Sequence, residues 1–316
     1  MILKNQIDFM GKRRIAALCS GVLIVISLLS LLLNSLQFGL DFTSGTSVRL
    51  SYDQTVNIPQ VNDTLEQGGY DDALVVSFGS DRDIRIILPV DEEIEEAEQS
   101  AAALQQGEEI ANVLRAASDA EIVLLGSDYV SAKVGEELAE DGGLGMLVAL
   151  FIIMIYISVR FQFKFAVGAV AALAHDVIVV LGVFSVFRLE FDLTVLAALL
   201  AVIGYSLNDT IVVADRIREN FRRMRKGTPV EMVNVSLNQT LSRTLITSFT
   251  TLLVLITMLI IGGESIRGFA IALTIGVLVG TYSSIYVASS TILYMNVTRE
   301  DLMIPVKEGA ELDGMP

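Results

Sequence analysis

Two ionisable residues stand out because they lie in or beside long apolar segments. Asp209 lies in segment 193–214, which otherwise carries no charge, and Arg243 comes just before apolar segment 245–261. A charge inside a membrane is costly, and such residues commonly mark an ion or proton path. Burial favours a neutral carboxyl, whereas a nearby guanidinium favours the carboxylate. We expect Arg243 to release a proton from Asp209 on approach and to let one return on separation; a static ion pair that fixes helix packing is the alternative.

Other polar residues lie in the same kind of segment. His175 is the only histidine of the chain, and Asp176 follows it. Histidine titrates near neutral pH, so His175 is either a proton relay or a hydrogen-bonded packing residue. Adjacent residues point about 100° apart on a helix, so His175 and Asp176 are not expected to face one partner. We expect Asp176 to face the bundle interior, either with a role in coupling or as part of the packing. Three further residues are expected to bond across helices or to line a wet path: Ser206, Asn208 and Thr247.

These residues need helices that hold them at membrane depth. A membrane-spanning helix takes about 20 apolar residues. Six segments qualify: 15–36, 142–159, 165–187, 193–214, 245–261 and 268–294. The first follows Lys12-Arg13-Arg14, but its apolar core is too long for a signal peptide and no Ala-x-Ala pattern follows it. We interpret it as a retained helix.

The connecting segments predict the orientation of these helices. Basic residues gather before the first helix, between the second and third, and after the fourth, which places those regions in the cytoplasm. Residues 37–141 instead carry 23 acidic and 5 basic side chains. The chain is thus divided into a cytoplasmic N-terminus (1–14), a first helix (15–36), an outer domain (37–141), five helices (142–294) with a basic cytoplasmic segment (215–242), and a cytoplasmic tail (295–316).

The outer domain alternates between strand and helix patterns. Strands are predicted at 47–52, 72–78, 84–88 and 121–125, helices at 58–67 and 93–117, and a turn at 79–81. The order β-α-β-β-α-β is that of the α+β ferredoxin-like, split βαβ motif. This domain contains no His and no Cys. We therefore interpret it as a binding or mechanical module and not as an enzyme domain.

A capping box precedes the fifth membrane segment. Thr228 can cap a helix, Pro229 suits its first turn and Glu231 completes the box. The pattern predicts a short helix 229–240 along the inner surface that leads Arg243 into the membrane. The arginines before it either set topology and touch anionic lipid or contact a cytoplasmic partner.

Glycines predict how some helices pack. Gly276 and Gly280 form a Gly-x-x-x-Gly pattern, which is typical of closely packed membrane helices. Gly142, Gly143 and Gly145 lie where the outer domain enters the second membrane segment. They mark either a hinge or a plain boundary between a loop and a helix.

Several classes of site are not expected. The chain lacks the Gly-x-x-x-x-Gly-Lys-Ser/Thr pattern of a nucleotide site, and its acidic run has no metal-ligand spacing. We therefore expect no cofactor and no metal. Cys19 is the only cysteine, so no intrachain disulfide is possible. Basic residues form only juxtamembrane clusters, which argues against nucleic-acid binding.

Several motifs carry a resemblance to a known family. Residues 39–46 read Gly-Leu-Asp-Phe-Thr-Ser-Gly-Thr and include Gly39, Asp41, Phe42 and Gly45. Ala174-His175-Asp176 lies in the third helix, residues 203–213 surround Asp209 in the fourth, and Ser242-Arg243-Thr244 begin the fifth. In this order the motifs closely resemble those of the SecF family. Ser44 departs from the signature, which has Gly there.

The resemblance implies a multi-pass subunit of the bacterial inner membrane, related to the resistance-nodulation-division transporters. It implies pairing with SecD, which would supply the other six-helix half, and association with the SecYEG channel and YajC. The outer domain would lie in the periplasm. The family uses the proton motive force in late steps of protein translocation, and its residues matching Asp209 and Arg243 are needed for proton coupling.

The leading hypothesis is thus a proton-coupled translocase subunit, not an enzyme, whose outer domain helps to draw or release unfolded polypeptide. One alternative is half of a proton-driven small-molecule exporter, which predicts a ligand crevice. The other is a non-catalytic scaffold for membrane assembly, which predicts that Asp209 and Arg243 are dispensable.

Overall fold

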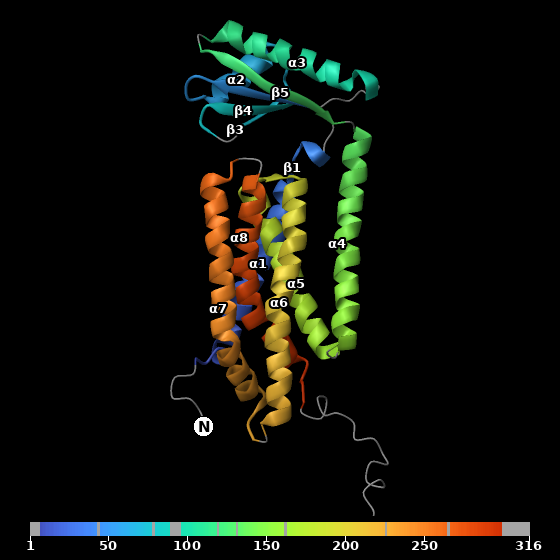
Figure 1. Cartoon of the computed structure of the whole chain (residues 1–316), viewed down its shortest axis with the longest axis vertical. Helices are drawn as coiled ribbons and strands as arrows, with labels where there is room; N and C mark the ends of the chain where they lie inside the picture. The colour runs from blue at the N-terminus through green and yellow to red at the C-terminus, as the bar shows by residue number, and fades with distance from the viewer. Residues whose placement is uncertain are drawn as a thin grey trace, which may run out of the picture.

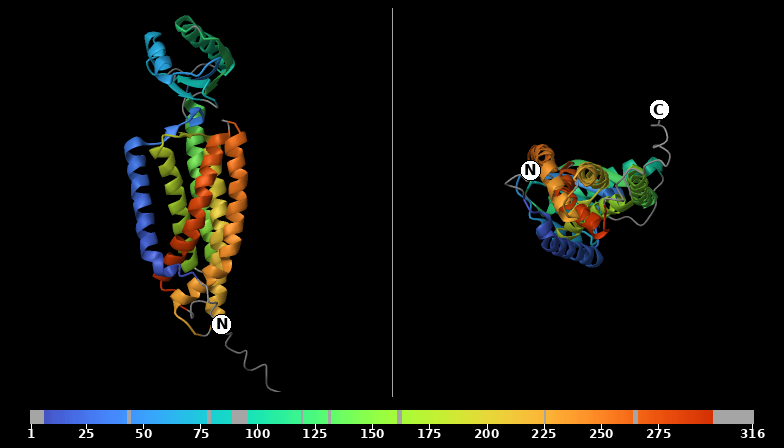
Figure 2. Two further views of the ribbon diagram at one scale, coloured as in Figure 1. Left: turned by 90° about the vertical axis from the view of Figure 1, so that its left-hand side faces the viewer. Right: turned by 90° about the horizontal axis from the view of Figure 1, so that it is seen from below.

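The protein consists of a long helical bundle with a small α+β domain at one end (Figure 1). The computed structural model describes residues 7–42, 45–77, 80–88, 96–118, 120–130, 132–160, 163–224, 226–263 and 266–298. Gly79 of the predicted turn, residues 93–95 of the predicted long helix and most of the predicted tail lie outside these ranges. The first and last described residues lie at the end of the bundle that is far from the α+β domain (Figures 1 and 2).

Six helical segments are long and apolar enough to cross a membrane, which confirms the predicted polytopic architecture. After the 3₁₀ turn η1 (Met10–Lys12) they are α1 (Arg13–Asn34), α4 (Ala132–Arg160), α5 (Phe163–Val186), α6 (Leu193–Arg223), α7 (Pro229–Ile261), and α8 (Arg267–Ser283) continued by η4 (Ser284–Ala288) and α9 (Ser289–Tyr294). The short turn η4 is a π-helix, which the sequence pattern did not predict.

Two helices are longer than their apolar segments predicted. α4 begins at Ala132 and passes through Gly142, Gly143 and Gly145, so no loop ends there. The residues before these glycines are good helix formers, and lipid leaves backbone groups no partner outside a helix. α7 runs unbroken from Pro229 to Ile261, so the separate surface helix predicted at 229–240 was wrong. The capping box at Thr228 is confirmed. The helix continues to Ile261 because no Gly or Pro lies between Pro229 and the C-cap residue Gly262.

α5 and α6 form the centre of the bundle. In the most apolar 18-residue stretch of each helix, 61% of the residues of α5 and 56% of those of α6 are buried, against 6% for α4 and 17% for α7. α4 therefore exposes most of its surface to lipid or to a partner, and it stands apart from the other helices in Figure 1. Close contact of α5 with α1 requires Gly182, because a Cβ there would overlap the side chain and Cα of Ser27.

The α+β domain is a four-stranded antiparallel sheet of order β3-β4-β2-β5. Its elements are β2 (Gly45–Tyr52), α2 (Ile58–Gln67), β3 (Leu74–Ser77), β4 (Asp83–Leu88), α3 (Glu96–Ala117) and β5 (Ile122–Val130). β4 pairs antiparallel with β2 and β3, so the parallel strands of the first βαβ unit are split by it. This is the predicted split βαβ arrangement. Both helices lie on the sheet face away from the bundle (Figure 2), and the core between them includes Val48, Leu50, Leu65, Ile86 and Ile110.

A second, two-stranded sheet lies between the domain and the bundle. β1 (Gln37–Phe38) follows α1 and pairs in parallel with β6 (Glu190–Phe191), which precedes α6. The sequence pattern did not predict this pairing. It brings the segment that enters the α+β domain against the outer end of α6.

Candidate functional site

Asp209 lies in the middle part of α6 and is 2% exposed. Its Oδ2 is buried and has no hydrogen-bond partner among the described residues. Unpartnered buried oxygens are rare, and an ionised carboxylate without donors is costly away from water. The predicted membrane carboxyl is thus in place, in surroundings that disfavour its charged form.

Arg243 lies on α7, which packs against α6. In contrast to Asp209, it is exposed. Among the ion pairs of the described residues none joins Arg243 to Asp209, although Arg243 is close enough to act on it electrostatically. In this conformation the two groups are therefore neighbours and not the static ion pair of the alternative hypothesis.

Arg243 lines a cavity of about 400 Å³ between α4, α6 and α7. The other lining residues are Tyr156, Ile211, Val212, Asp215, Arg216, Gln239 and Thr240. The cavity thus extends from Arg243 towards the last turns of α6, on the side of the bundle where both chain ends lie. Next to Arg243, Thr244 is buried and its Oγ1 has no partner among the described residues.

Asp176 is the centre of a second polar cluster. It is fully buried on α5, and its Oδ2 accepts hydrogen bonds from Ser206 of α6 at 2.6 Å and from Ser283 of α8 at 2.8 Å. Its Oδ1 lies 3.0 Å from Nδ1 of His175. The prediction that Asp176 faces the bundle interior is confirmed. The two neighbours nevertheless contact each other, because side chains 100° apart on a helix can still meet at their tips.

His175 is 2% exposed and its Nε2 has no partner among the described residues. Its ring packs against Tyr282, whose hydroxyl donates to the carbonyl of Ala16 at 2.7 Å and lies 3.0 Å from Ser20 Oγ. His175 therefore lies between the Asp176 cluster and α1.

Hydroxyl pairs join α6 to the helices on either side of it. Thr210 Oγ1 lies 2.9 Å from Ser284 Oγ in the π-helical turn η4. Tyr205 donates to Ser248 of α7 at 3.2 Å, and Ser248 lies 2.6 Å from Thr281 of α8. π-helical turns occur often at functional sites. These pairs were not predicted from the sequence, where their only signal was the presence of hydroxyl residues in apolar segments.

Of the three other predicted polar residues, only Ser206 fills one of the expected roles. Ser206 bonds across helices to Asp176, as expected. Thr247 bonds back to the carbonyls of Arg243 and Thr244 in its own helix. Asn208 is exposed and makes no hydrogen bond to another described residue. Its amide therefore faces lipid or a partner.

The Gly-x-x-x-Gly prediction is confirmed by the contact of α8 with α6. A Cβ on Gly276 would overlap the side chain of Val202. On Gly280 it would lie 3.1 Å from Ser206 Cβ and 3.5 Å from Asp176 Oδ2. Gly280 thus leaves room for the Asp176 cluster itself.

The signature residues lie at the outer end of α6. Asp41 accepts a hydrogen bond from the Leu193 amide at 3.0 Å, while Asp192 accepts one from Val195 at 2.8 Å. Both carboxylates thus cap the start of α6, where backbone amides lack helical partners. A Cβ on Gly39 would lie 2.9 Å from Glu190 Oε1.

Aromatic rings complete this junction. Phe42 stacks on Phe191 with centroids 5.7 Å apart, and Phe38 and Phe184 meet Phe191 edge-on. Gly45, which starts β2, has φ +147°, a conformation that favours glycine. The described residues of the signature therefore lie where the bundle meets the α+β domain.

An ion pair fastens the sheet of the domain to this junction. Arg85 of β4 donates to Glu190 of β6 at 3.0 Å, and both side chains are mostly buried. Burial raises the pKa of Glu190, and the nearby Asp192 and Asp41 act in the same direction, against Arg85. We name the contacts of Asp41, Arg85 and Glu190, with the β1–β6 pair, the outer latch.

The polar groups of the bundle are single carboxyl, guanidinium, imidazole and hydroxyl side chains. The described residues contain no group of three or more His, Cys, Asp or Glu side chains that could hold a metal ion. They offer instead an unpartnered membrane carboxyl, an exposed guanidinium beside it, and a mechanical connection from α6 to the outer domain.

Comparisons with known proteins match this arrangement. The family described as "Protein export membrane protein SecD/SecF, C-terminal" matches residues 109–298, and "SecD/SecF GG Motif" matches residues 30–56. The chain is 48% identical to the protein translocase subunit SecF of Pseudomonas aeruginosa, with 95% of each chain covered. It is 40% identical to that of Escherichia coli O157:H7, with 96% of this chain and 93% of the relative covered.

Solved structures show the same fold. The crystal structure of SecDF from Thermus thermophilus, described as a translocon-associated membrane protein, has a TM-score of 0.82 and 34% identity. It covers 94% of this chain, while this chain spans 39% of the SecDF chain. SecDF in the super-membrane-facing form has a TM-score of 0.66 at the same identity and coverage. On these grounds the chain belongs to the SecF members of the SecD/SecF protein-export family.

Proposed function

We propose that this chain is one half of a proton-coupled protein translocase, which with SecD uses the proton motive force in late steps of translocation. Similarity to translocase subunits over nearly the whole chain supports the translocase role. The observation that carries the proton step is Asp209, a buried membrane carboxyl with an unpartnered oxygen beside an exposed arginine.

The proton step depends on how Arg243 moves. While the Arg243 side chain lines the cavity and stays apart from Asp209, burial favours the neutral form of the Asp209 carboxyl. When α7 shifts so that the guanidinium meets the carboxyl, the carboxylate is stabilised and the proton leaves. The cavity of about 400 Å³ beside Arg243 supplies a route for water and protons on the side of the chain ends.

Relatives of this chain exist in more than one arrangement, as a proton-driven cycle requires. At equal identity and coverage the two SecDF structures differ in TM-score, 0.82 against 0.66. Sequence distance therefore does not account for the difference, and arrangement does. A group that binds a proton in only one arrangement shifts the equilibrium between the two.

The outer latch transmits movement of α6 to the α+β domain. Asp41 caps α6 at Leu193, and Glu190 holds β4 through Arg85. A shift or rotation of α6 that accompanies protonation of Asp209 therefore moves the sheet that contacts polypeptide. One proton crossing 100 mV supplies about 2.3 kcal/mol, which suffices to bias this equilibrium.

SecD covers the exposed face of α6. This face carries Ala197, Ala201, Gly204 and Asn208, all exposed and spaced to lie on one side of the helix. Small residues let helices approach, and an asparagine amide in lipid seeks a partner across an interface. The face lies next to Asp209, so a second half docked here completes the surroundings of the carboxyl.

The remaining partners and the location follow from the same proposal. The basic residues at the chain-end side of the bundle support an orientation with both termini in the cytoplasm and the α+β domain in the periplasm of an inner membrane. The complex then acts with SecYEG and YajC on unfolded polypeptide that emerges at the outer face.

Translocation into energised inverted vesicles tests the proposal. Asp209→Asn and Arg243→Met are compared with the unaltered chain, with and without a proton gradient. Glu219→Gln and Arg223→Met are matched controls, because both residues are exposed near the end of α6. We expect the gradient-dependent part of translocation to vanish in the first pair only, with assembly with SecD intact.

Other outcomes identify other functions. Full gradient-dependent activity of Asp209→Asn would contradict the proton step and support the scaffold. Loss of small-molecule efflux without loss of translocation would support the exporter. If translocation depended on a gradient of Na⁺ instead of H⁺, Asp209 and Arg243 would remain the coupling site and Na⁺ would be the coupling ion.

A further inference from the structure

A large hollow opens at the end of the bundle where both chain ends lie, far from Asp209 and from the outer latch. Its volume is about 930 Å³, and it lies between the starts of α1 and α7 and the end of α9. The residues that line it are Arg13, Arg14, Ala17, Pro229, Val230, Ser290, Thr291, Leu293, Tyr294 and Asn296. None of the translocation steps above uses it.

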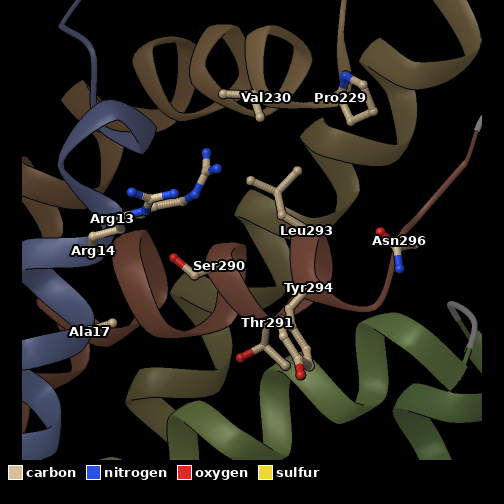
Figure 3. A pocket seen from close by; sticks show the side chains of 10 residues that line it. All are labelled: Arg13, Arg14, Ala17, Pro229, Val230, Ser290, Thr291, Leu293, Tyr294 and Asn296. Atoms are coloured by element: carbon tan, nitrogen blue, oxygen red, sulfur yellow. The ribbon is translucent and has the colours of Figure 1, made fainter.

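The hollow combines two cations with apolar walls. Figure 3 shows the side chains of Arg13 and Arg14 extending from α1 into the space, across from Val230 of α7 and Leu293 of α9. No acidic residue is among the described residues that line it. Lys164 lies at its edge, where it donates to the carbonyl of Asn296 at 3.1 Å.

Neither arginine forms an ion pair within the described part of the chain. Arg14 is exposed and forms no ion pair with a described residue. Arg13 makes one long hydrogen bond, 3.5 Å, to the carbonyl of Met10 and forms no ion pair with a described residue. Guanidinium groups present planar donor forks that match phosphate oxygens.

The position of the hollow matches the headgroup level of a membrane. Arg13 and Arg14 are at the start of the first spanning segment, and Tyr294 ends the last. Tyr294 is 87% exposed, as expected of a tyrosine at a membrane interface. The same part of α1 also exposes Ile15 and Leu18, which give acyl chains an apolar surface to follow along this helix.

We propose that this hollow binds one anionic glycerophospholipid, with its phosphate on Arg13 and Arg14 and its acyl chains along α1. Basic pockets between membrane helices bind such headgroups. The lipid would contact α1, α7 and α9 together, which the hollow separates at this end of the bundle. A zwitterionic lipid brings a compensating cation next to the two arginines and binds less tightly.

Lipid titration of the purified full chain in detergent tests the site. Binding of phosphatidylglycerol and of phosphatidylethanolamine is measured by native mass spectrometry and by the rise in unfolding temperature. The test variant is Arg13→Gln/Arg14→Gln. The matched control is Arg222→Gln/Arg223→Gln, which removes the same charge from the same end of the bundle, at exposed positions outside the hollow.

We expect phosphatidylglycerol to bind the test variant about thirtyfold more weakly than the unaltered chain, since each basic residue contributes about a factor of five. The control pair should bind as the unaltered chain does. Equal unfolding temperatures without added lipid would show that the test variant is folded. Equal weakening in both variants, or unchanged binding in the test variant, would overturn the proposal.

Two further arms separate other occupants. Residues 299–316 follow Asn296 and carry five acidic and two basic residues. If this segment fills the hollow, a chain ending at residue 298 will bind phosphatidylglycerol more tightly than the full chain, and the assignment to lipid fails. Inorganic phosphate alone should leave the unfolding temperature unchanged; protection equal to that of the lipid would also overturn it.

Discussion

The membrane bundle holds two buried aspartates whose oxygens have opposite surroundings. Asp176 accepts bonds from Ser206 and Ser283 and contacts His175, deep between α5, α6 and α8. Asp209 is as well buried, yet its Oδ2 has no partner among the described residues, and the charge that acts on it lies on exposed Arg243. One carboxyl is enclosed by donors that cannot leave without unpacking helices, while the other depends on a side chain beside a cavity.

Under the proposed function, this difference makes Asp176 a structural carboxyl and Asp209 an exchangeable one. Hydrogen bonds fix a group in one state because breaking them leaves buried donors unsatisfied. A group with an open oxygen changes its proton at smaller cost, provided that a counter-charge can approach and withdraw. Burial in a membrane is therefore not by itself a sign of proton coupling; the donors around each oxygen decide.

Asp209→Asn should have the largest functional effect. Asparagine keeps the shape of the group but cannot exchange a proton, so gradient-driven translocation should fall to the level without a gradient. The unfolding temperature should stay within the error of the unaltered chain, because Asp209 Oδ2 has no hydrogen bond to a described residue that the substitution could remove. Translocation and thermal unfolding measured on the same preparation check both parts.

Asp176→Asn should show the opposite pattern. Replacing the carboxyl that accepts hydrogen bonds from Ser206 and Ser283 should destabilise the protein by about 1–3 kcal/mol. Residual translocation should still respond to the gradient once corrected for folded protein. Unchanged stability combined with lost gradient dependence would make Asp176 and His175 a proton relay and would break the comparison.

Much of this contrast was open to prediction from the sequence, and part was not. Asp209, Arg243 and Asp176 were found because any charge stands out against about 20 apolar residues. Which aspartate has donors was not visible, because Ser283, Tyr205 and Tyr282 look like the many hydroxyl residues that membrane helices tolerate. Only the packing of α5, α6 and α8 selects the serines that reach Asp176.

The fold shows the same division. The helices and the split βαβ order follow from apolar periodicity, and the Gly-x-x-x-Gly contact from spacing. The outer latch could not be predicted in this way, because β1 and β6 are two-residue strands about 150 positions apart in the sequence. The hydrogen bond from Leu193 to Asp41 spans a similar separation. The role of Asp41 was signalled only by its place in a family signature.

A pair of hydroxyl deletions sharpens the comparison at smaller scale. Ser206→Ala removes a donor to Asp176 and should cost about 1–3 kcal/mol of unfolding free energy. Thr244→Val removes a buried hydroxyl that has no partner among the described residues and should be neutral or slightly stabilising. Denaturant or thermal unfolding of the two variants in one detergent measures the difference. Equal losses would mean that the donors around Asp176 are not what holds it.

The smallest effect is expected at Glu190, a third carboxyl that lies between the two cases. It has a donor, Arg85, yet burial outweighs that contact and raises its pKa above the usual 4.5. The folded protein therefore holds the Glu190 proton more tightly than the unfolded chain does. Its contribution to stability is complete below the ordinary pKa and is lost as pH rises through the raised one.

Glu190→Gln should remove this dependence. The stability of the unaltered chain, minus that of the variant, should fall as pH rises from the ordinary pKa of glutamate towards neutrality, and then level off. Glu219→Gln, an exposed carboxyl on α6, controls for the loss of one negative charge. Thermal unfolding across this pH range measures the difference. A difference that instead grows with pH would show that the ion pair with Arg85 dominates, which would place Glu190 with Asp176 among the carboxyls that are fixed by their donors.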